Sequence, residues 1–389
     1  MGGESNDALP QMATRITEYH AAHPCAIPAN RERGVRSVGV MTPAALGLHP
    51  WRSSAARSVT VEAIDGLGTD VRATIDWAVR IGRDAPLPGG GRTAQLWELL
   101  AETARLDVGA ARILEPHLDA RAILCQARRE GVDIDAALDA VGADRDASWG
   151  VFAAEAPGVR LEATANGADG WRLDGTKPWC SLAASLSHAL VTAWVSPDER
   201  GLFAVPLGAA GVSARSGPWV SRGLSQVISA PVDFDGVSAV PVGEPGWYLS
   251  RPGFAWGGIG VAAAWWGGVL PVHDALVAAA GRDGADQIAW FSAGSSDAAL
   301  WAARAVLAEA AEAIDTGSGD EDTATLAGRT RAVVADAVER VLALADHALG
   351  PGPLTSDEDH ARRVADLRVY VRQHHGERDL ARLGRRLLP

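Results

Sequence analysis

Hydrophobic residues recur at three- and four-residue intervals through much of the first third of the chain, which is the spacing of one helix face. The pattern runs over residues 96–106 and again over 109–128, with charged residues between the apolar ones. Alanine and leucine, which favour helices, are frequent in both segments. The proline- and glycine-rich residues 86–91 predict a loop before the first of these helices. Residues 1–50 are less periodic and predict irregular structure or an extended arm.

The pattern changes near Trp149. From there to Val242 the chain has short apolar runs separated by Gly, Asp, Pro and Ser, which is typical of an antiparallel barrel or sandwich. After Gly246 the helical spacing returns. Alanine-rich or heavily charged amphipathic segments predict further helices over residues 297–314, 326–349 and 360–388.

This order of elements predicts an α+β multidomain protein with three parts. We expect an N-terminal helical domain at 1–147, a middle antiparallel β-barrel at 148–243 and a C-terminal helical bundle at 244–389. Residues 254–272 carry no charge and are long enough to span a bilayer. Their many glycines, Pro271 and the lack of a flanking basic cluster favour a helix buried on all sides, so we expect no membrane span.

Composition narrows the classes of function. The chain has 389 residues, a hydrophobic fraction of 47% and a formal net charge of −12, with no Lys/Arg-rich block. A surface of this charge repels phosphate backbones, so no nucleic-acid partner is expected. Three widely spaced cysteines without a CxxC pair predict neither a disulfide framework nor a thiolate zinc site. The N-terminus carries no secretory signal, and a cytoplasmic location is expected.

Four segments resemble motifs of the acyl-CoA dehydrogenase superfamily, in the same order. Residues 171–181, WRLDGTKPWCS, resemble the family's LxGxKxW/F strand, and 152–158 resemble its TEPxxGS loop. Residues 223–237 resemble the RGSxT…VxFxxV hairpin, and 242–247 resemble the glycine-rich start of the C-terminal domain. By these segments the chain is identified as a divergent member of the superfamily, whose fold is a helical domain, a β-barrel and a helical bundle.

The resemblance implies FAD as cofactor and α,β-desaturation of an acyl thioester linked to CoA or to a carrier protein. A flavin needs a flat apolar wall, hydrogen bonds to its polar edge and a site that excludes water. By resemblance Trp179 supplies the wall and Ser181 a hydroxyl near the reactive nitrogen, while Glu155 and Gly158 lie near the cofactor. The alternatives are a tryptophan packed in the barrel core and a serine bonded to local backbone.

The family's catalytic base does not appear where the resemblance places it. That base is a glutamate about eleven residues before the terminal GR, and Gln373 occupies the position here. Glu377 lies one helical turn further on. His374 and His375 are the other candidates, because an imidazole has a pKa suited to proton transfer near neutrality. The alternative is that these residues belong to a solvated, charged helix surface.

Two further departures concern the rest of the cofactor. The family's RxxFG segment, which reaches a neighbouring subunit's FAD, is reduced here to Arg282 in a shortened loop, and the QxxGGxGY loop has become residues 349–354. The resemblance also implies a homodimer or homotetramer assembled through the C-terminal helices, and an acyl thioester or another apolar small molecule as substrate.

Two other functions therefore stay open. One is a flavin-dependent monooxygenase on the same fold, in which a C-terminal histidine takes part and whose KxFCSG variant resembles residues 177–181. The other is a flavin-poor binding or assembly protein. Glu115 and His117 lie on a helix that lines the substrate channel in related proteins, with a core histidine as the alternative for His117. Trp265 and Trp266 are candidates for the lining of an acyl pocket.

Overall fold

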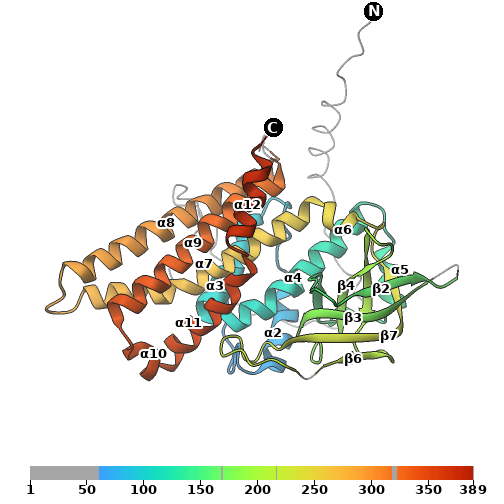
Figure 1. Cartoon of the computed structure of the whole chain (residues 1–389), viewed down its shortest axis with the longest axis horizontal. Coiled ribbons are helices and arrows are strands. Elements are labelled where there is room, and N and C mark those ends of the chain that lie inside the picture. Colours follow the sequence, from blue (N-terminus) through green and yellow to red (C-terminus); the bar gives the residue numbers. More distant parts are fainter. Residues whose placement is uncertain (1–60, 168–169, 216, 318–321, 389) are drawn as a thin grey trace, which may run out of the picture.

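A computed structural model of the chain describes residues 61–167, 170–215, 217–317 and 322–388. Long helices form one side of the molecule and a sheet forms the other (Figure 1). The arm or irregular structure expected for residues 1–50 lies outside the described residues.

The N-terminal helices follow the periodicity of the sequence closely. The helices expected over 96–106 and 109–128 are confirmed as α3 and α4, and a capping aspartate starts α4, because Asp107 Oδ1 accepts from the Ala110 amide at 2.8 Å. His117 on α4 is buried, which confirms the alternative of a core histidine. This part of the chain contains α2 (Val71–Gly82), α3 (Thr93–Leu106), α4 (Val108–Arg129) and α5 (Ile134–Ala140).

The middle segment forms a closed barrel of five strands. Its order is β4–β2–β3–β7–β5, and β5 pairs with β4 to close the ring, while β1 and β6 lie outside it. The strands are β1 (Trp149–Phe152), β2 (Leu161–Ala165), β3 (Trp171–Ser181), β4 (His188–Trp194), β5 (Arg200–Pro206), β6 (Val212–Ala214) and β7 (Ser229–Pro241).

The prediction of a purely antiparallel barrel is wrong for one strand. β4 runs parallel to both β1 and β2, and β1 lies opposite residues 188–191 while β2 lies opposite Trp194. The other edge of β4 is occupied by β5 along its full length. β1 and β2 therefore pair one after the other with the same edge of β4 and run in the same direction. The loop over residues 153–160 separates them.

The C-terminal part is a helical bundle, and the helices expected over 297–314, 326–349 and 360–388 are found there. The last of these is divided by a 3₁₀ turn into two helices. The elements are α6 (Trp247–Ser250), α7 (Pro252–Ala280), α8 (Gln287–Thr316), α9 (Thr323–Leu349), α10 (Gly352–Ser356), α11 (Glu358–Tyr370), the turn η1 (Val371–Gln373) and α12 (Glu377–Arg386).

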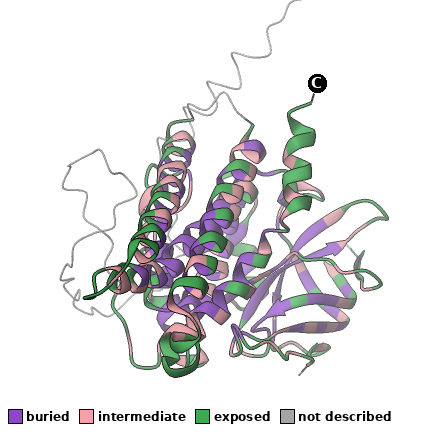
Figure 2. Cartoon of the chain, turned by 60° about the vertical axis from the view of Figure 1, so that its left-hand side comes forward, coloured by how far each residue is buried: buried purple, intermediate pink, exposed green. Residues whose placement is uncertain are grey.

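Helix α7 is the centre of the bundle. It is long and apolar enough to cross a membrane by length and composition, but 67% of its most apolar window is buried among other helices, as in the core helix of a soluble protein. A Cβ on Gly267 would lie 2.0 Å from the Ala101 carbonyl oxygen, so glycine allows α7 to contact α3 directly. Trp265 and Trp266 are buried core residues of α7. The predicted burial of this helix is confirmed, and buried faces point into the bundle in Figure 2.

The barrel and the bundle have separate apolar cores. A third cluster joins them, because residues of α4 and α5 pack with residues of β1, β4 and β5 and with α6 around Ile123, Leu138, Trp149, Leu190 and Leu202. This cluster fixes α4 against the barrel and so positions the site described next. The change from helix to strand falls between Ala140 and Trp149, and the return to helix between Pro241 and Trp247. The domain boundaries themselves stay a prediction.

Candidate functional site

Trp179 holds its ring out of the barrel near the end of β3. The side chain is 58% exposed, and its backbone has φ +59°, in the left-handed region that a tryptophan rarely adopts. The pairing of β3 with β7 is irregular between Lys177 and Cys180, which turns this one residue outward. The alternative of a tryptophan packed in the barrel core is therefore wrong. A flat apolar ring faces solvent at this position.

Ser181, two residues further on, is buried and held by side chains from two directions. Its Oγ lies 2.7 Å from Ser229 Oγ on β7 and accepts a 3.0 Å hydrogen bond from Nη2 of Arg112 on α4. The hydroxyl is thus fixed by side chains of other elements rather than by adjacent backbone. β3 carries both the exposed Trp179 ring and the fixed Ser181 hydroxyl. The hydrogen bond from Arg112 joins it to α4, the helix that the third apolar cluster holds against the barrel.

Arg112 connects Ser181 to Glu115, a largely buried carboxyl group that lies on α4 like Arg112 itself. Its Nη1 lies 3.3 Å from Oε2 of Glu115, one turn further along α4. Burial raises the pKa of Glu115 to about 7, and the positive charge of Arg112 opposes that shift only in part. The guanidinium of Arg112 also lies 5.8 Å from the ring centroid of Tyr370 on α11.

A second arginine, Arg331 on α9, lies within electrostatic range of the Glu115 carboxyl group. It donates from Nη1 to the carbonyl of Gly258 and from Nη2 to the carbonyl of Gln373 at 3.0 Å, and its guanidinium lies 4.8 Å from the Trp265 ring. Burial lowers the pKa of Arg331. Within the part of the chain that the structure describes, no carboxylate lies within ion-pair distance of this guanidinium. We call Arg112, Glu115, Arg331 and Tyr370 the polar cluster.

Polar atoms without a hydrogen-bond partner gather at the polar cluster. The hydroxyl of Tyr370, Nε1 of Trp265 and Nε2 of His374 are all buried and have no partner among the described residues. The Tyr370 and Trp265 rings pack edge to face at 6.2 Å. Leaving such a group unsatisfied typically costs about 1–3 kcal/mol, so three in one region indicate a place for a ligand or for water.

The structure separates the three candidates for the catalytic base. His374 follows η1, is buried, and is next in the chain to Gln373, whose carbonyl Arg331 binds. Burial lowers the pKa of His374, so the ring is neutral at pH 7. His375 is exposed, with Nδ1 3.5 Å from a carboxylate oxygen of Asp379, and Glu377 is exposed at the first turn of α12. Of the three, His374 is the one brought to the polar cluster.

Glu155 and Gly158 lie on the loop between β1 and β2. The Glu155 carboxylate binds Nζ of the buried Lys177 at 2.6 Å and Nη1 of Arg200 at 3.1 Å, so the side chain ties this loop to the barrel. Gly158 is exposed, with φ +73°. Cofactor roles for both residues stay predictions, and the ion pairs give the Glu155 side chain a structural role of its own.

Arg282 lies far from these residues within one chain. It is exposed on the loop between α7 and α8, at the end of the bundle opposite to the sheet (Figure 1). A cofactor role for Arg282 therefore requires the site of a neighbouring subunit, as the resemblance implies.

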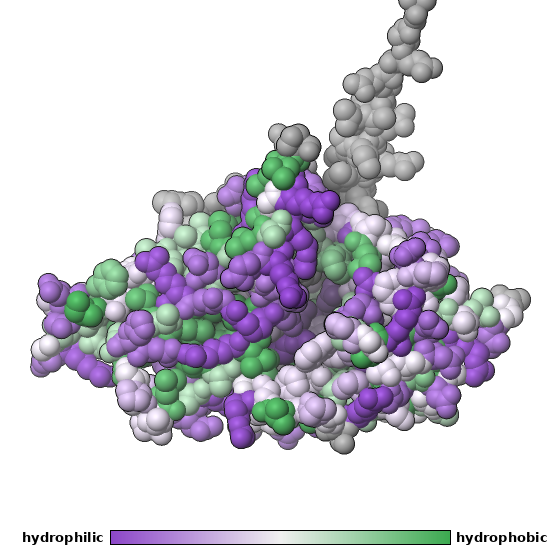
Figure 3. Space-filling view, viewed as in Figure 1, coloured by the Kyte–Doolittle hydropathy of each residue, from purple (hydrophilic) through white to green (hydrophobic). Residues whose placement is uncertain are grey.

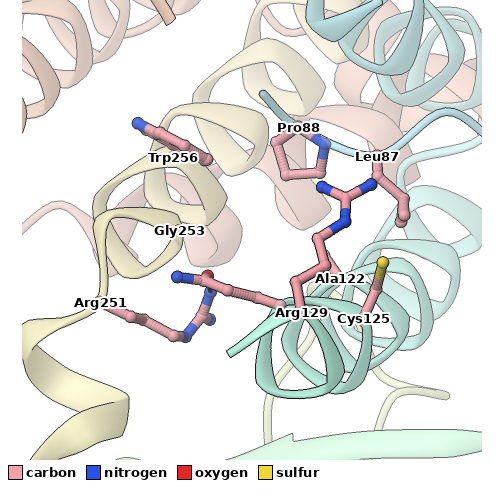
Figure 4. A pocket seen from close by; sticks show the side chains of 9 residues that line it. Leu87, Pro88, Ala122, Cys125, Arg129, Arg251, Gly253 and Trp256 are labelled. Atoms are coloured by element: carbon pink, nitrogen blue, oxygen red, sulfur yellow. Dashed lines mark hydrogen bonds between the residues drawn. The ribbon is translucent and has the colours of Figure 1, made fainter. Parts of the chain in front are cut away.

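A small separate pocket lies between α4, the start of α7 and the loop before α3 (Figure 4). Its floor is the buried Arg251, which donates from Nη1 to Oε1 of Gln126 at 3.1 Å and lies 3.5 Å from Oδ1 of Asp119. The space between its lining residues is about 280 Å³, including part of the open solvent at its mouth.

The space-filling view shows a hollow with mostly hydrophilic walls between the C-terminal helices and the sheet (Figure 3). In the described ranges no group of three or more His, Cys, Asp or Glu side chains is arranged to hold a metal ion.

The sequence reasoning missed Arg112, Arg331 and Tyr370. Arg112 and Glu115 are three residues apart on one helix, so their pairing had a local signal. Arg331 and Tyr370 come from other helices, and only tertiary packing brings them to α4.

No protein-family model and no curated protein matches the chain. Solved structures do. The nitrososynthase of Micromonospora carbonacea var. africana is 19% identical, with 84% of this chain and 98% of that chain covered at a TM-score of 0.66. Butyryl-CoA dehydrogenase of Megasphaera elsdenii is 17% identical, with 82% and 89% covered at 0.68. FMN-bound TdsC of Paenibacillus sp. A11-2 is 18% identical, with 82% and 95% covered at 0.63. The chain therefore has the fold of the acyl-CoA dehydrogenase superfamily, as its sequence motifs predicted.

Proposed function

We propose that this chain is a flavin-dependent oxidoreductase that holds the flavin against Trp179 and Ser181. One observation carries the proposal: a tryptophan kept 58% exposed beside a hydroxyl fixed by Arg112 at 3.0 Å. The ring offers a flat apolar wall, and the hydroxyl offers a hydrogen bond to a polar edge. These residues fit a flavin, which when bound would supply hydride or electron transfer.

The choice between FMN and FAD is a finer part of the proposal. The sequence resemblance implies FAD, whereas a neighbour of the same fold, TdsC, has FMN bound. Because Arg282 lies at the far end of the bundle, FAD would need Arg282 from a second subunit. Chromatography of the flavin released from purified protein separates the two cofactors.

The chain's own residues account for positioning and for proton transfer. Arg112 holds Ser181 in place from α4. Trp179 would cover one face of a bound flavin ring. His374 is buried and neutral, and its Nε2 has no partner among the described residues, so this nitrogen is free to accept or donate a proton. We propose His374 as the proton-transfer group.

Desaturation of an acyl thioester is the first reaction that we propose. It requires a base that removes the α-proton, and His374 follows directly after the position of the family's glutamate. Butyryl-CoA dehydrogenase among the structural neighbours supports this reaction.

Flavin-dependent monooxygenation is the second candidate, and a specific observation favours it. The buried group at this position is a histidine rather than a carboxylate, and residues 177–181 resemble the monooxygenase variant of the strand motif. The structural neighbour TdsC is a dibenzothiophene monooxygenase.

Spectroscopy of the purified full-length chain tests the proposal. A bound flavin gives visible absorbance, and a thioester dehydrogenase is bleached by its substrate without oxygen. A monooxygenase instead consumes oxygen with reduced flavin and is not bleached by thioesters. A colourless protein that takes up neither oxidised nor reduced flavin contradicts both reactions and supports the alternative of a binding or assembly protein.

We also propose that two or more copies assemble through α8. Four large apolar side chains of this helix are 50–62% exposed: Ile288, Trp290, Phe291 and Trp301. Apolar groups of this size gathered on one helix are typical of an interaction surface. Ile288, Trp290 and Phe291 lie in the first turns of α8, next to the loop that carries Arg282, which supports a contribution of Arg282 to a second subunit.

A further inference from the structure

We infer that the polar cluster binds the carboxylate of an acidic small-molecule substrate beside the flavin wall. This inference names a substrate class and rests on the proposed function. It differs from the apolar acyl pocket that the sequence suggested, because Trp265 and Trp266 lie in the core and charged side chains occupy the space next to Ser181.

The charge of the polar cluster is unbalanced. It contains two guanidinium groups and one carboxyl group, and Glu115 lies at ion-pair distance from Arg112. Arg331 bonds to two backbone carbonyls and lies over the face of Trp265, and the charges of Asp379 and Glu115 act on it without lying at ion-pair distance. An anion that entered here would be attracted by both guanidinium groups.

The cluster also has donors to spare. A guanidinium carries five N–H groups. Arg331 uses two nitrogens in its bonds to Gly258 and Gln373, and Arg112 uses two toward Glu115 and Ser181. The Tyr370 hydroxyl has no partner at all in the described part of the chain. Two arginine forks and a phenol hydroxyl match the four acceptor sites of a carboxylate.

The position of the cluster allows a small molecule to reach it. The side chains of Arg112 and Glu115 keep 16% and 13% of their area exposed, so solvent reaches the cluster at these two residues. Because Arg112 binds Ser181, a carboxylate on Arg112 lies one side chain away from the residues that hold the flavin. The substrate would thus be anchored at its acidic end, with the remainder directed toward β3.

Glu115 fits the same site when it is protonated. Burial raises its pKa to about 7, so a large fraction is neutral at pH 7 and offers an O–H donor rather than a repelling charge. A second carboxylate beside Glu115 would favour the neutral form further, and binding would therefore take up protons.

Isothermal titration calorimetry on the full-length, flavin-loaded chain tests the inference, with glutarate as the probe. Glutaramide has the same length without charge, and inorganic phosphate separates a carboxylate site from a general anion site. We expect glutarate to bind and glutaramide not to bind, with phosphate at least tenfold weaker than glutarate.

Three variants locate the site. Tyr370→Phe removes only the hydroxyl and should weaken glutarate binding by roughly tenfold or more, as expected for a hydrogen bond to a charged group. Arg331→Gln should abolish binding. Arg368→Gln is the control, because Arg368 is exposed and pairs with Asp346 on the outside of the bundle, and this variant should bind glutarate as the unaltered chain does.

Equal affinity of Tyr370→Phe and the unaltered chain would overturn the inference, as would glutarate and glutaramide binding alike or phosphate binding more tightly than glutarate. A repeat of the titration on flavin-free protein separates this inference from the proposed function. Glutarate binding in a chain that takes up no flavin contradicts the oxidoreductase and supports the carboxylate site. Flavin uptake without glutarate binding supports the oxidoreductase and contradicts the carboxylate site.

Discussion

Arg112 donates a 3.0 Å hydrogen bond from Nη2 to the Oγ of Ser181, and this contact joins helix α4 to strand β3 at the candidate site. On one side of it lies Trp179, exposed on the barrel, and on the other side lies the polar cluster in the bundle. The bond therefore links the residues proposed to hold a flavin to those proposed to hold the substrate.

His374 and His375 give a matched pair for the proton-transfer role. We expect His374→Gln to lower the turnover rate by roughly 10²–10⁴-fold, because a positioned general base contributes about that factor. His375 is exposed, and His375→Gln should change the rate little. Stopped-flow measurement of flavin reduction or oxygen consumption decides between them. Equal effects of the two substitutions would contradict the assignment.

The ion pair between Glu155 and Lys177 should stabilise the barrel. Lys177 is almost fully buried, so Glu155→Gln leaves a charge without its counter-ion and should lower the free energy of unfolding by about 3 kcal/mol. Glu162→Gln is the control, since Glu162 is exposed and pairs with Arg160, and it should cost less than about 1 kcal/mol. Urea denaturation measures both. Loss of flavin affinity without loss of stability would instead support a cofactor role for Glu155.

Glu115 should make stability depend on pH. Burial raises its pKa from 4.5 to about 7 on folding; the positive charges of Arg112 and Arg331 oppose this shift, and the negative charge of Asp119 adds to it. The folded state binds this proton more tightly, so stability is fully present below pH 4.5 and falls as the pH rises toward 7. The loss is on the order of 3 kcal/mol.

Glu115→Gln removes this titration and supplies the test. The variant and the unaltered chain should have similar stability at pH 5, and the variant should be the more stable of the two at pH 8. Chemical denaturation at both pH values measures the free energy of unfolding of each protein. The other titrating groups are the same in both proteins, so their contributions cancel in the difference between the two. A variant whose stability falls as steeply as that of the unaltered chain contradicts the buried, protonated Glu115.

Trp290 tests the proposed assembly. Trp290→Glu places a charge on the exposed face of α8 and should convert dimers or tetramers to monomers, as read by light scattering. Val220→Glu is the control, because Val220 is 86% exposed on a loop of the sheet side, away from α8. A monomeric unaltered chain, or an assembly that persists in the Trp290 variant, rules out this surface.

Local patterns in the sequence predicted the helices well. The segment 326–349 and helix α9 end at the same residue, because Gly350 follows directly and takes φ +62°. The parallel pairing of β4 was beyond such patterns. In this pairing β1 and β2 share one edge of β4, and nothing in the sequence of β1 or β2 specifies β4 as the partner.

The site could be predicted only where a motif runs along one strand. Trp179 and Ser181 follow from the strand motif, whereas Arg331 and Tyr370 reach the site from separate helices. Adjacent residues such as His374 and His375 point in different directions, and the 3₁₀ turn before them decides which is buried. No periodicity in the sequence marks that turn.

The most direct test of a flavin on β3 is a flavin titration of two variants. Trp179→Ala removes the proposed wall, and Phe254→Ala removes another exposed aromatic ring, at the first turn of α7, which has no part in the proposed site or assembly. We expect the unaltered chain and Phe254→Ala to bind flavin with the same affinity, and Trp179→Ala to bind at least tenfold more weakly, because stacking on an aromatic side chain is worth about 1–3 kcal/mol per base and a flavin ring presents a similar face. Undiminished flavin affinity in Trp179→Ala would contradict the account.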